Sequence, residues 1–255
     1  MILRMHPLYH VDPDNPALDL LTWYNLIGAG GCVFWILAYL FILLKCFKDK
    51  SYGLPMVAIC LNFGWEILAS FVFPNPVKLW HWFDRIWLLV DVLLVYQMLR
   101  WGAKQQRLAE VGRHFYWVVL VTFGVGVWGQ YAFVSSYVDR LGLVGAFGVN
   151  LIMSITFISF YLARKPALLG ISRGGAVCKM LGTLGTSIEC HWVVRSINPE
   201  LRNLSFLTFL CVCIFAADCF YIYLVFSPQK HVTMKDPTPA ASGPDQARAE
   251  PLSGR

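Results

Sequence analysis

The amino-acid sequence predicts an all-α membrane protein, a bundle of about seven transmembrane helices. Of its 255 residues, 57% are hydrophobic and only 14% are charged, whereas soluble domains average roughly 25% charged residues. The hydrophobic residues are grouped in blocks long enough to cross a bilayer, which takes roughly 20 residues in a helix. Together these observations exclude a soluble globular domain.

Seven mostly apolar blocks follow one another along the chain, and short polar segments separate them. Each block is near the length at which a helix spans the hydrocarbon core. The sixth block is the least apolar, because it contains Lys179, Glu189 and His191. In chain order the blocks are residues 24–44, 55–73, 82–99, 114–134, 143–162, 174–194 and 204–226.

The chain is expected to form one membrane domain, residues 1–226, followed by a cytoplasmic tail, residues 227–255. The polar N-terminal segment, residues 1–19, contains three Asp residues and no short apolar stretch, so it does not resemble a cleavable signal peptide. The tail is rich in Pro, Ala, Ser and charged residues. It cannot bury enough apolar surface to offset its ordering entropy, and we expect it to be disordered.

Lysine and arginine are distributed unevenly between the two sets of short loops. One side carries ten of these residues and the other carries six, before the tail is counted. The positive-inside rule therefore places the N-terminus outside or in the lumen and the C-terminus in the cytoplasm. The net charge of +6 then reflects topology, because the chain has no basic domain on which nucleic acid could bind.

Two carboxyl groups lie deep inside predicted spans, Glu66 in the second block and Asp218 in the seventh. With a rise of 1.5 Å per residue, they lie roughly 16 Å and roughly 12 Å above the cytoplasmic edge. An ionisable group at this depth is unfavourable unless it is paired, neutralised or hydrated. We expect both carboxyls to line one cavity; the alternative is that hydrogen-bonded carboxyls fix helix packing.

Polar and aromatic residues accompany these two acids. Asn62 projects from the same helical face as Glu66, with Phe63 alongside, and Asp91 lies near mid-depth as a third candidate acid. Further aromatic residues inside the predicted spans include Trp65, Trp87 and Tyr221. Each of these rings, taken singly, is better explained by packing than by function.

Other charged residues lie toward the ends of the predicted spans. Lys179 is near the cytoplasmic end, where its ammonium group can reach the interface. Asp84 and Glu189 are near the outer end, and Arg85 or the interface can serve Asp84. For Lys179 and Glu189, structural pairing and function are both open.

Buried acids and aromatic rings around an apolar pocket suit one kind of chemistry. A carboxyl group deprived of water stays uncharged and can act as a general acid. Aromatic faces stabilise cations, increasingly so where water is excluded. The acid would protonate an alkene or an epoxide, and exclusion of water would protect the carbocation that forms.

Four segments carry a resemblance to a known family: NFGWE at 62–66, WFDRIWLLVD at 82–91, KMLGTLGT at 179–186 and AADCFYIY at 216–223. Over roughly residues 20–226 the chain resembles the small integral-membrane terpene cyclases of meroterpenoid and indole-terpenoid biosynthesis, known from fungi and also from bacteria. The resemblance implies cyclisation of a prenylated aromatic or indole substrate in secondary metabolism. It also implies that an acid in span two and another in span seven are essential, which here are Glu66 and Asp218.

The resemblance further implies that neither a metal nor a cofactor takes part, and no DDxxD or DxDD motif is present. Glu66 is the expected proton donor, and Asp218 is expected to share that role or to orient the prenyl chain. The expected partners are the small-molecule substrate and the lipid bilayer, with no nucleic acid. The membrane would be the endoplasmic reticulum in a fungus or the cytoplasmic membrane in a bacterium.

Other seven-helix membrane proteins are the competing interpretations. A small proton-coupled transporter would also use acids near the midplane, although the chain shows no internal repeat, which transporters commonly have. A seven-helix receptor is disfavoured. The Asp-Arg-Tyr motif of those receptors lies at the end of the third span, whereas the Asp84–Arg85 pair lies at the start of the third block. A retinal protein needs a lysine in the last span, which is missing. Head group, prenyl length, ring stereochemistry and oligomeric state do not follow from the sequence.

Overall fold

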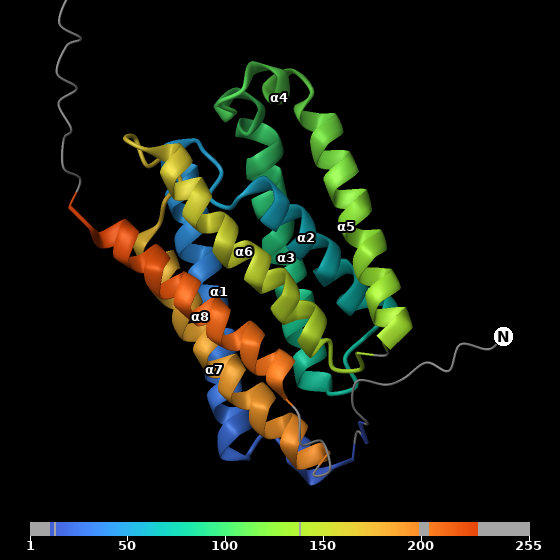
Figure 1. The fold of residues 1–255 in the computed structure, drawn as a ribbon. Helices are drawn as coiled ribbons and strands as arrows, with labels where there is room; N and C mark the ends of the chain where they lie inside the picture. The colour runs from blue at the N-terminus through green and yellow to red at the C-terminus, as the bar shows by residue number, and fades with distance from the viewer. Residues whose placement is uncertain (1–10, 13, 138, 199–203, 229–255) are drawn as a thin grey trace, which may run out of the picture.

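The computed structural model describes residues 11–12, 14–137, 139–198 and 204–228, and all regular structure in these ranges is helical (Figure 1). The first ten residues and the tail from residue 229 lie outside the described residues. Three short helical segments are η1 (Pro16–Leu18), the π-helix η2 (Leu68–Val72) and η3 (Ala103–Gln105). The α-helices are α1 (Trp23–Asp49), α2 (Met56–Ile67), α3 (Lys78–Trp101), α4 (Ala109–Arg113), α5 (Phe115–Tyr137), α6 (Leu143–Arg164), α7 (Arg173–Ile197) and α8 (Ser205–Phe226).

Each of the seven predicted apolar blocks coincides with a helix, but the helices differ in apolar character. Four of the described helices are long and apolar enough to cross a membrane by length and composition: the segment Pro16–Asp49 that contains α1, and α5, α6 and α8. Helix α2 with its continuation η2 is apolar but shorter. Helices α3 and α7 are less apolar, and they carry charged side chains that are buried inside the bundle.

Helices α1, α2, α3, α6 and α7 form the centre of the bundle, and α5 and α8 pack against them. Helix α1 packs against α7 and α3, and α2 packs against α3 and α6. Helix α5 lies on the outer side of α2, and α8 packs against α6 and α7 (Figure 1). The first helix starts at one end of the bundle and the last helix finishes at the other.

Glycine residues bring α1 and α7 unusually close. A Cβ atom added at Gly31 of α1 would lie 2.8 Å from the carbonyl oxygen of Gly182 and 2.9 Å from the backbone nitrogen of Thr186, both in α7. Small residues allow such backbone approach, which is a common way to pack helices in membranes. The contact fixes α7, the helix that carries Lys179 and Glu189.

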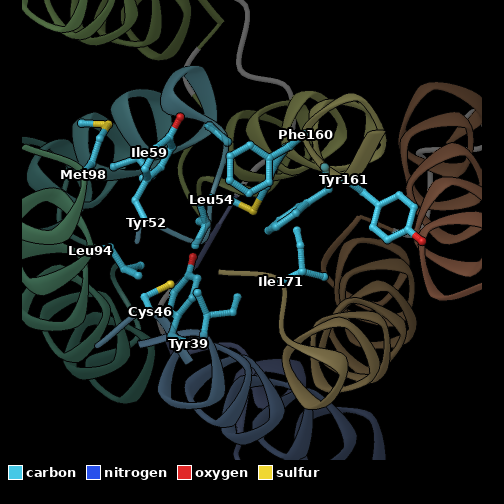
Figure 2. Packing of buried hydrophobic residues seen from close by; sticks show 14 of the residues in the cluster. Tyr39, Cys46, Tyr52, Leu54, Ile59, Leu94, Met98, Phe160, Tyr161 and Ile171 are labelled. Atoms are coloured by element: carbon cyan, nitrogen blue, oxygen red, sulfur yellow. The ribbon is translucent and has the colours of Figure 1, made fainter. Parts of the chain in front are cut away.

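The largest cluster of buried hydrophobic side chains fills one end of the bundle, where α1 ends and α2 begins. Figure 2 shows side chains from α1, α2, α3 and α6 and from the connections between helices meeting there, among them Tyr39, Cys46, Leu54 and Tyr161. Cys46 and Leu54 are fully buried. This end of the protein is therefore closed by packed side chains.

Arg164, the last residue of α6, adds polar contacts to the closed end. Its Nη1 donates hydrogen bonds to Ser51 Oγ at 2.7 Å and to Gln105 Oε1 at 2.9 Å. Its guanidinium carbon lies 4.4 Å from the centre of the Tyr52 ring. These contacts join the α1–α2 connection, η3 and α6.

Candidate active site

A cavity occupies the other end of the bundle, where the α2–α3 and α5–α6 connections meet. Its volume is about 190 Å³. The lining residues come from α1, α2, α3, α5, α6 and α7 and the nearby connections. Among the described residues, none from α8 lines it.

Most of the cavity wall is aromatic or aliphatic. Rings come from four helices and the α2–α3 connection, so a bound molecule would meet aromatic faces on several sides. Such faces stabilise a positive charge where water is excluded. The aromatic lining residues are Trp35, Tyr39, Trp65, Phe73, Trp80, Trp87 and Phe147.

Glu66 lies in this wall, near the end of α2. Its side chain belongs to a residue that is 5% exposed, and its Oε2 atom is buried with no hydrogen-bond partner among the described residues. Directly after it the helix widens into the π-helix η2, whose Leu68 and Ala69 also line the cavity. Single π-helical turns occur frequently at functional sites.

Asn62, one turn before Glu66, lines the same wall and binds two neighbours. Its Nδ2 donates to Asp91 Oδ2 at 2.7 Å and to the Tyr39 hydroxyl at 2.9 Å. Asp91 itself is buried and is not among the lining residues. Asp91 is thus a hydrogen-bonded acid behind the wall, whereas Glu66 is an unpartnered acid in it.

Three further carboxyl groups line the cavity, those of Asp84, Asp139 and Glu189. The sequence placed Asp84 and Glu189 near the outer end, and pairing with a neighbour was one explanation for each of these two. In the described part of the chain, neither has a hydrogen bond or an ion pair, and Arg85 instead lies over the Trp82 ring. The wall also contains Arg140.

The structure does not bring Asp218 to this cavity. Asp218 is 1% exposed, and both its carboxylate oxygens accept hydrogen bonds from Lys179 Nζ, at 2.7 Å and 2.8 Å. The expectation that Glu66 and Asp218 line one cavity is therefore wrong. The physical reason is that α8 lies behind α6 and α7, so equal depth in the bilayer does not mean a common chamber.

Lys179 does not reach the interface, as the sequence had suggested. It is 2% exposed, and besides Asp218 it donates to Ser154 Oγ at 2.6 Å. Its ammonium nitrogen also lies 5.2 Å from the centre of the Trp35 ring, and Trp35 lines the cavity. The Lys179–Asp218 pair therefore lies behind the wall and supports it. The buried Asp218 carboxylate is the counter-charge that explains why the lysine remains inside.

Hydrogen bonds connect this ion pair to the cavity surface. Ser154 Oγ donates to Asn150 Oδ1 at 3.4 Å, and Asn150 Nδ2 donates to Thr183 Oγ1 at 3.1 Å. Asn150 lines the cavity. The charge of Lys179 thus constrains the orientation of a polar group that a bound molecule could touch.

The other residues singled out from the sequence divide between cavity and packing. Trp65 and Trp87 line the cavity. Phe63 does not; its ring packs against that of Phe123 in α5, with centroids 5.6 Å apart. Tyr221 belongs to the core at the closed end, where its ring lies 5.0 Å from that of Phe157.

Comparison with known proteins shows which family the chain resembles. The model of the Pyr4-like transmembrane terpene cyclases matches residues 11–231. Terpene cyclase macJ of Penicillium terrestre is 29% identical over 170 residues, which is 64% of this chain and 64% of macJ. The Pyr4-family terpene cyclase mfmH of Annulohypoxylon moriforme is 28% identical over 172 residues, 65% of this chain and 70% of mfmH.

A third relative, asnovolin H synthase nvfL of Aspergillus novofumigatus, is 23% identical over 200 residues, 73% of this chain and 80% of nvfL. This chain spans just under two thirds of the length of macJ. No solved structure matches the chain. Since the family model covers all eight α-helices, the chain belongs to the Pyr4-like transmembrane terpene cyclases.

Proposed function

We propose that this protein is a membrane-embedded terpene cyclase that acts by proton-initiated carbocation cyclisation. The observation that carries the proposal is the unpartnered Glu66 carboxyl in a cavity walled by aromatic rings. The substrate is a prenylated aromatic or indole compound with a terminal alkene or epoxide, as in meroterpenoid biosynthesis. The names of macJ, mfmH and nvfL, two terpene cyclases and a synthase, support this class of reaction.

Glu66 is the proposed proton donor. A carboxyl group in a dry wall without an ion-pair partner is favoured in its uncharged form and retains a proton to give. Proton transfer to a terminal alkene converts its π electrons into a C–H bond; transfer to an epoxide oxygen breaks a C–O bond. Either step leaves a tertiary carbocation on the prenyl chain and a carboxylate on Glu66.

The aromatic wall has the second role. Once the carbocation forms, the remaining double bonds attack it in turn, and the positive charge moves along the chain as rings close. Trp35, Trp65 and Trp87, from three different helices, present faces to this moving charge. Such faces stabilise it electrostatically without acting as nucleophiles.

Asp218 is proposed to act through Lys179. Both of its oxygens are engaged by the Lys179 ammonium group, and it does not line the cavity. Through Ser154 the lysine constrains Asn150, a polar group in the wall. Asp218 is in this view a positioning residue that keeps Lys179 charged and in place.

The proposed membrane arrangement has all seven long helices crossing the bilayer, with the N-terminus in the lumen or outside. The charged residues that make α3 and α7 less apolar, among them Asp91 and Lys179, are buried against other helices, so they need not face lipid. The ten-to-six excess of Lys and Arg supports a cytoplasmic C-terminus. Protease protection of a C-terminal epitope tag in sealed microsomes checks this orientation.

Conversion of candidate substrates by the purified protein tests the activity. The protein in lipid nanodiscs is incubated with farnesylated and geranylgeranylated aromatic acids and indoles, each as alkene and as terminal epoxide. The expected product has the mass of its substrate and a different chromatographic retention, because cyclisation that ends in proton loss is an isomerisation. Glu66→Gln should abolish it. Proton-driven uptake into vesicles without conversion would instead support a transporter.

A further inference from the structure

We propose that Glu189 is the proton acceptor that ends the cyclisation. The inference rests on the proposed function and adds a catalytic residue to it. Glu189 lines the same cavity as Glu66, is 7% exposed, and has no hydrogen bond or ion pair with any described residue. It is therefore a buried acid that no structural contact explains.

The position of Glu189 suits the last step of the reaction. It comes from α7, which packs against α1 and α8, whereas Glu66 comes from α2, which packs against α3, α5 and α6. The two carboxyls thus approach the cavity from different walls. Cyclisation carries the positive charge away from the carbon that is first protonated, so donor and acceptor must be separated by the new ring system.

Asp84 is less suited to this role. It is on α3, which packs directly against α2, so it shares the Glu66 wall. A base beside the donor would recapture the proton at the start of the cascade. Asp139, the remaining acid in the wall, already accepts a hydrogen bond from the Gly145 backbone at 2.8 Å.

The backbone of α1 is shaped around the Glu189 side chain. A Cβ atom added at Gly28 would overlap the Glu189 carboxyl group. The absence of a side chain at Gly28 therefore leaves the space in which this carboxyl lies. Two residues further along the same helix, a Cβ at Gly30 would meet nothing within 4 Å, which provides a matched comparison.

The surroundings of Glu66 and Glu189 differ in a way that favours a proton donor at Glu66 and a proton acceptor at Glu189. One oxygen of Glu66 is shut off without a partner, whereas neither oxygen of Glu189 is. A carboxylate is less unfavourable where the cavity reaches its oxygens than where an oxygen is fully buried without a partner. Two acids in unlike environments can hold opposite protonation states and act as an acid and a base.

The proposed step balances as follows. The carbon next to the last cationic carbon loses a proton, and the electrons of that C–H bond form a double bond in the product. The proton passes to a carboxylate oxygen of Glu189. Overall the substrate gains one proton from Glu66 and loses one to Glu189, so the reaction is an isomerisation. Proton exchange with water then returns a proton to Glu66 and removes the proton from Glu189.

Product analysis of Glu189→Gln, with a substrate that the wild-type protein converts, tests the inference. A positioned base contributes about 10²–10⁴-fold to a proton transfer. We expect Glu189→Gln to keep consuming substrate, while the wild-type alkene falls at least about tenfold among the products. Alternative alkenes and water-quenched alcohols should replace it. Glu66→Gln should instead stop substrate consumption.

Matched variants separate this role from a loss of fold. Gly28→Ala, which displaces the Glu189 carboxyl without removing it, should shift the products in the same direction, and Gly30→Ala should not. Asp84→Asn, in the Glu66 wall, should shift the product ratio less than Gly28→Ala does. These three comparisons remain decisive even if Glu189→Gln does not fold.

Several results would overturn the inference while leaving the cyclase proposal intact. They are an unchanged product ratio in Glu189→Gln and Gly28→Ala, a shift in Asp84→Asn equal to that in Glu189→Gln, or a folded Glu189→Gln that consumes no substrate. A wild-type product with the mass of its substrate plus one water would also exclude a terminal base, because water would then have captured the last cation. Failure of the wild-type protein to cyclise any substrate of the panel would count against the proposed function itself.

Discussion

Glu66 and Asp218 are both buried in the helix bundle, but their carboxyl groups have opposite surroundings. Glu66 lies in an aromatic wall and one of its oxygens has no partner among the described residues. Asp218 lies behind the wall, and a lysine ammonium group binds both of its oxygens. The same residue chemistry is therefore available to a ligand in one place and engaged by the protein in the other.

This difference predicts how each acid responds to substitution. Removing one partner of a buried ion pair leaves an uncompensated charge, which destabilises the fold strongly. Removing an acid that has no partner leaves nothing uncompensated behind it. Substitutions at the two acids should therefore have different effects. Loss of Glu66 should mainly abolish substrate conversion, whereas loss of Asp218 should mainly destabilise the fold.

The largest expected effect is on the ion pair. Asp218→Leu and Lys179→Met should each lower the free energy of unfolding by about 3–5 kcal/mol, because each leaves its partner buried and unpaired. The double variant should regain most of that loss, since replacing both charges by apolar groups is often neutral or stabilising. Unfolding in mixed detergent micelles, followed by circular dichroism, gives the three values.

The double variant also decides the role of Asp218. If Asp218 acts only by holding Lys179, a stable double variant retains substrate conversion, reduced by the loss of the link to Asn150. A double variant that is as stable as wild type and converts nothing would show that the Asp218–Lys179 pair is needed for conversion as well as for the fold.

An opposite pattern is expected at Glu66. Glu66→Leu should raise the free energy of unfolding by about 1–3 kcal/mol, because it replaces an unsatisfied buried polar group by an apolar one. Conversion should fall at least about 100-fold with the loss of the general acid. The same detergent unfolding and product assays apply. A Glu66→Leu protein as unstable as the Asp218→Leu protein would contradict the contrast between the two sites.

The helices and the acid in the cavity could be predicted from local features of the sequence. Apolar blocks of about 20 residues define helices whatever their neighbours, and each block became a helix. Glu66 was identified because an acid in the middle of such a block needs a reason to be there. Trp65, in the same helix, and Trp87, in α3, were singled out as aromatic residues inside predicted spans, and both line the cavity.

The pairing of Lys179 with Asp218 depended on information that one helix alone does not hold. Residue rise gives the depth of a side chain, but the direction in which it points depends on which helices surround it. A signal was nevertheless available. Lys179 is six residues into α7 and Asp218 is eight residues from the end of α8, so the two charges lie at similar depth from one end. Opposite charges at equal depth are candidates for pairing.

The smallest expected effect concerns the aromatic wall and would sharpen the contrast between cavity and exterior. Trp87 lines the cavity, whereas Trp82, five residues earlier on the same helix, is 59% exposed and contacts Arg85 on the surface. A cation–aromatic contact is worth about 0.5–2 kcal/mol, so Trp87→Leu should slow conversion roughly 2- to 30-fold. Trp82→Leu should change it less than about twofold, because its ring meets no developing charge. Initial rates with a single substrate, at equal amounts of folded protein, measure both. Equal losses in the two variants would mean that tryptophan supports the helix and not the carbocation, and the aromatic wall would then be packing like the core at the closed end.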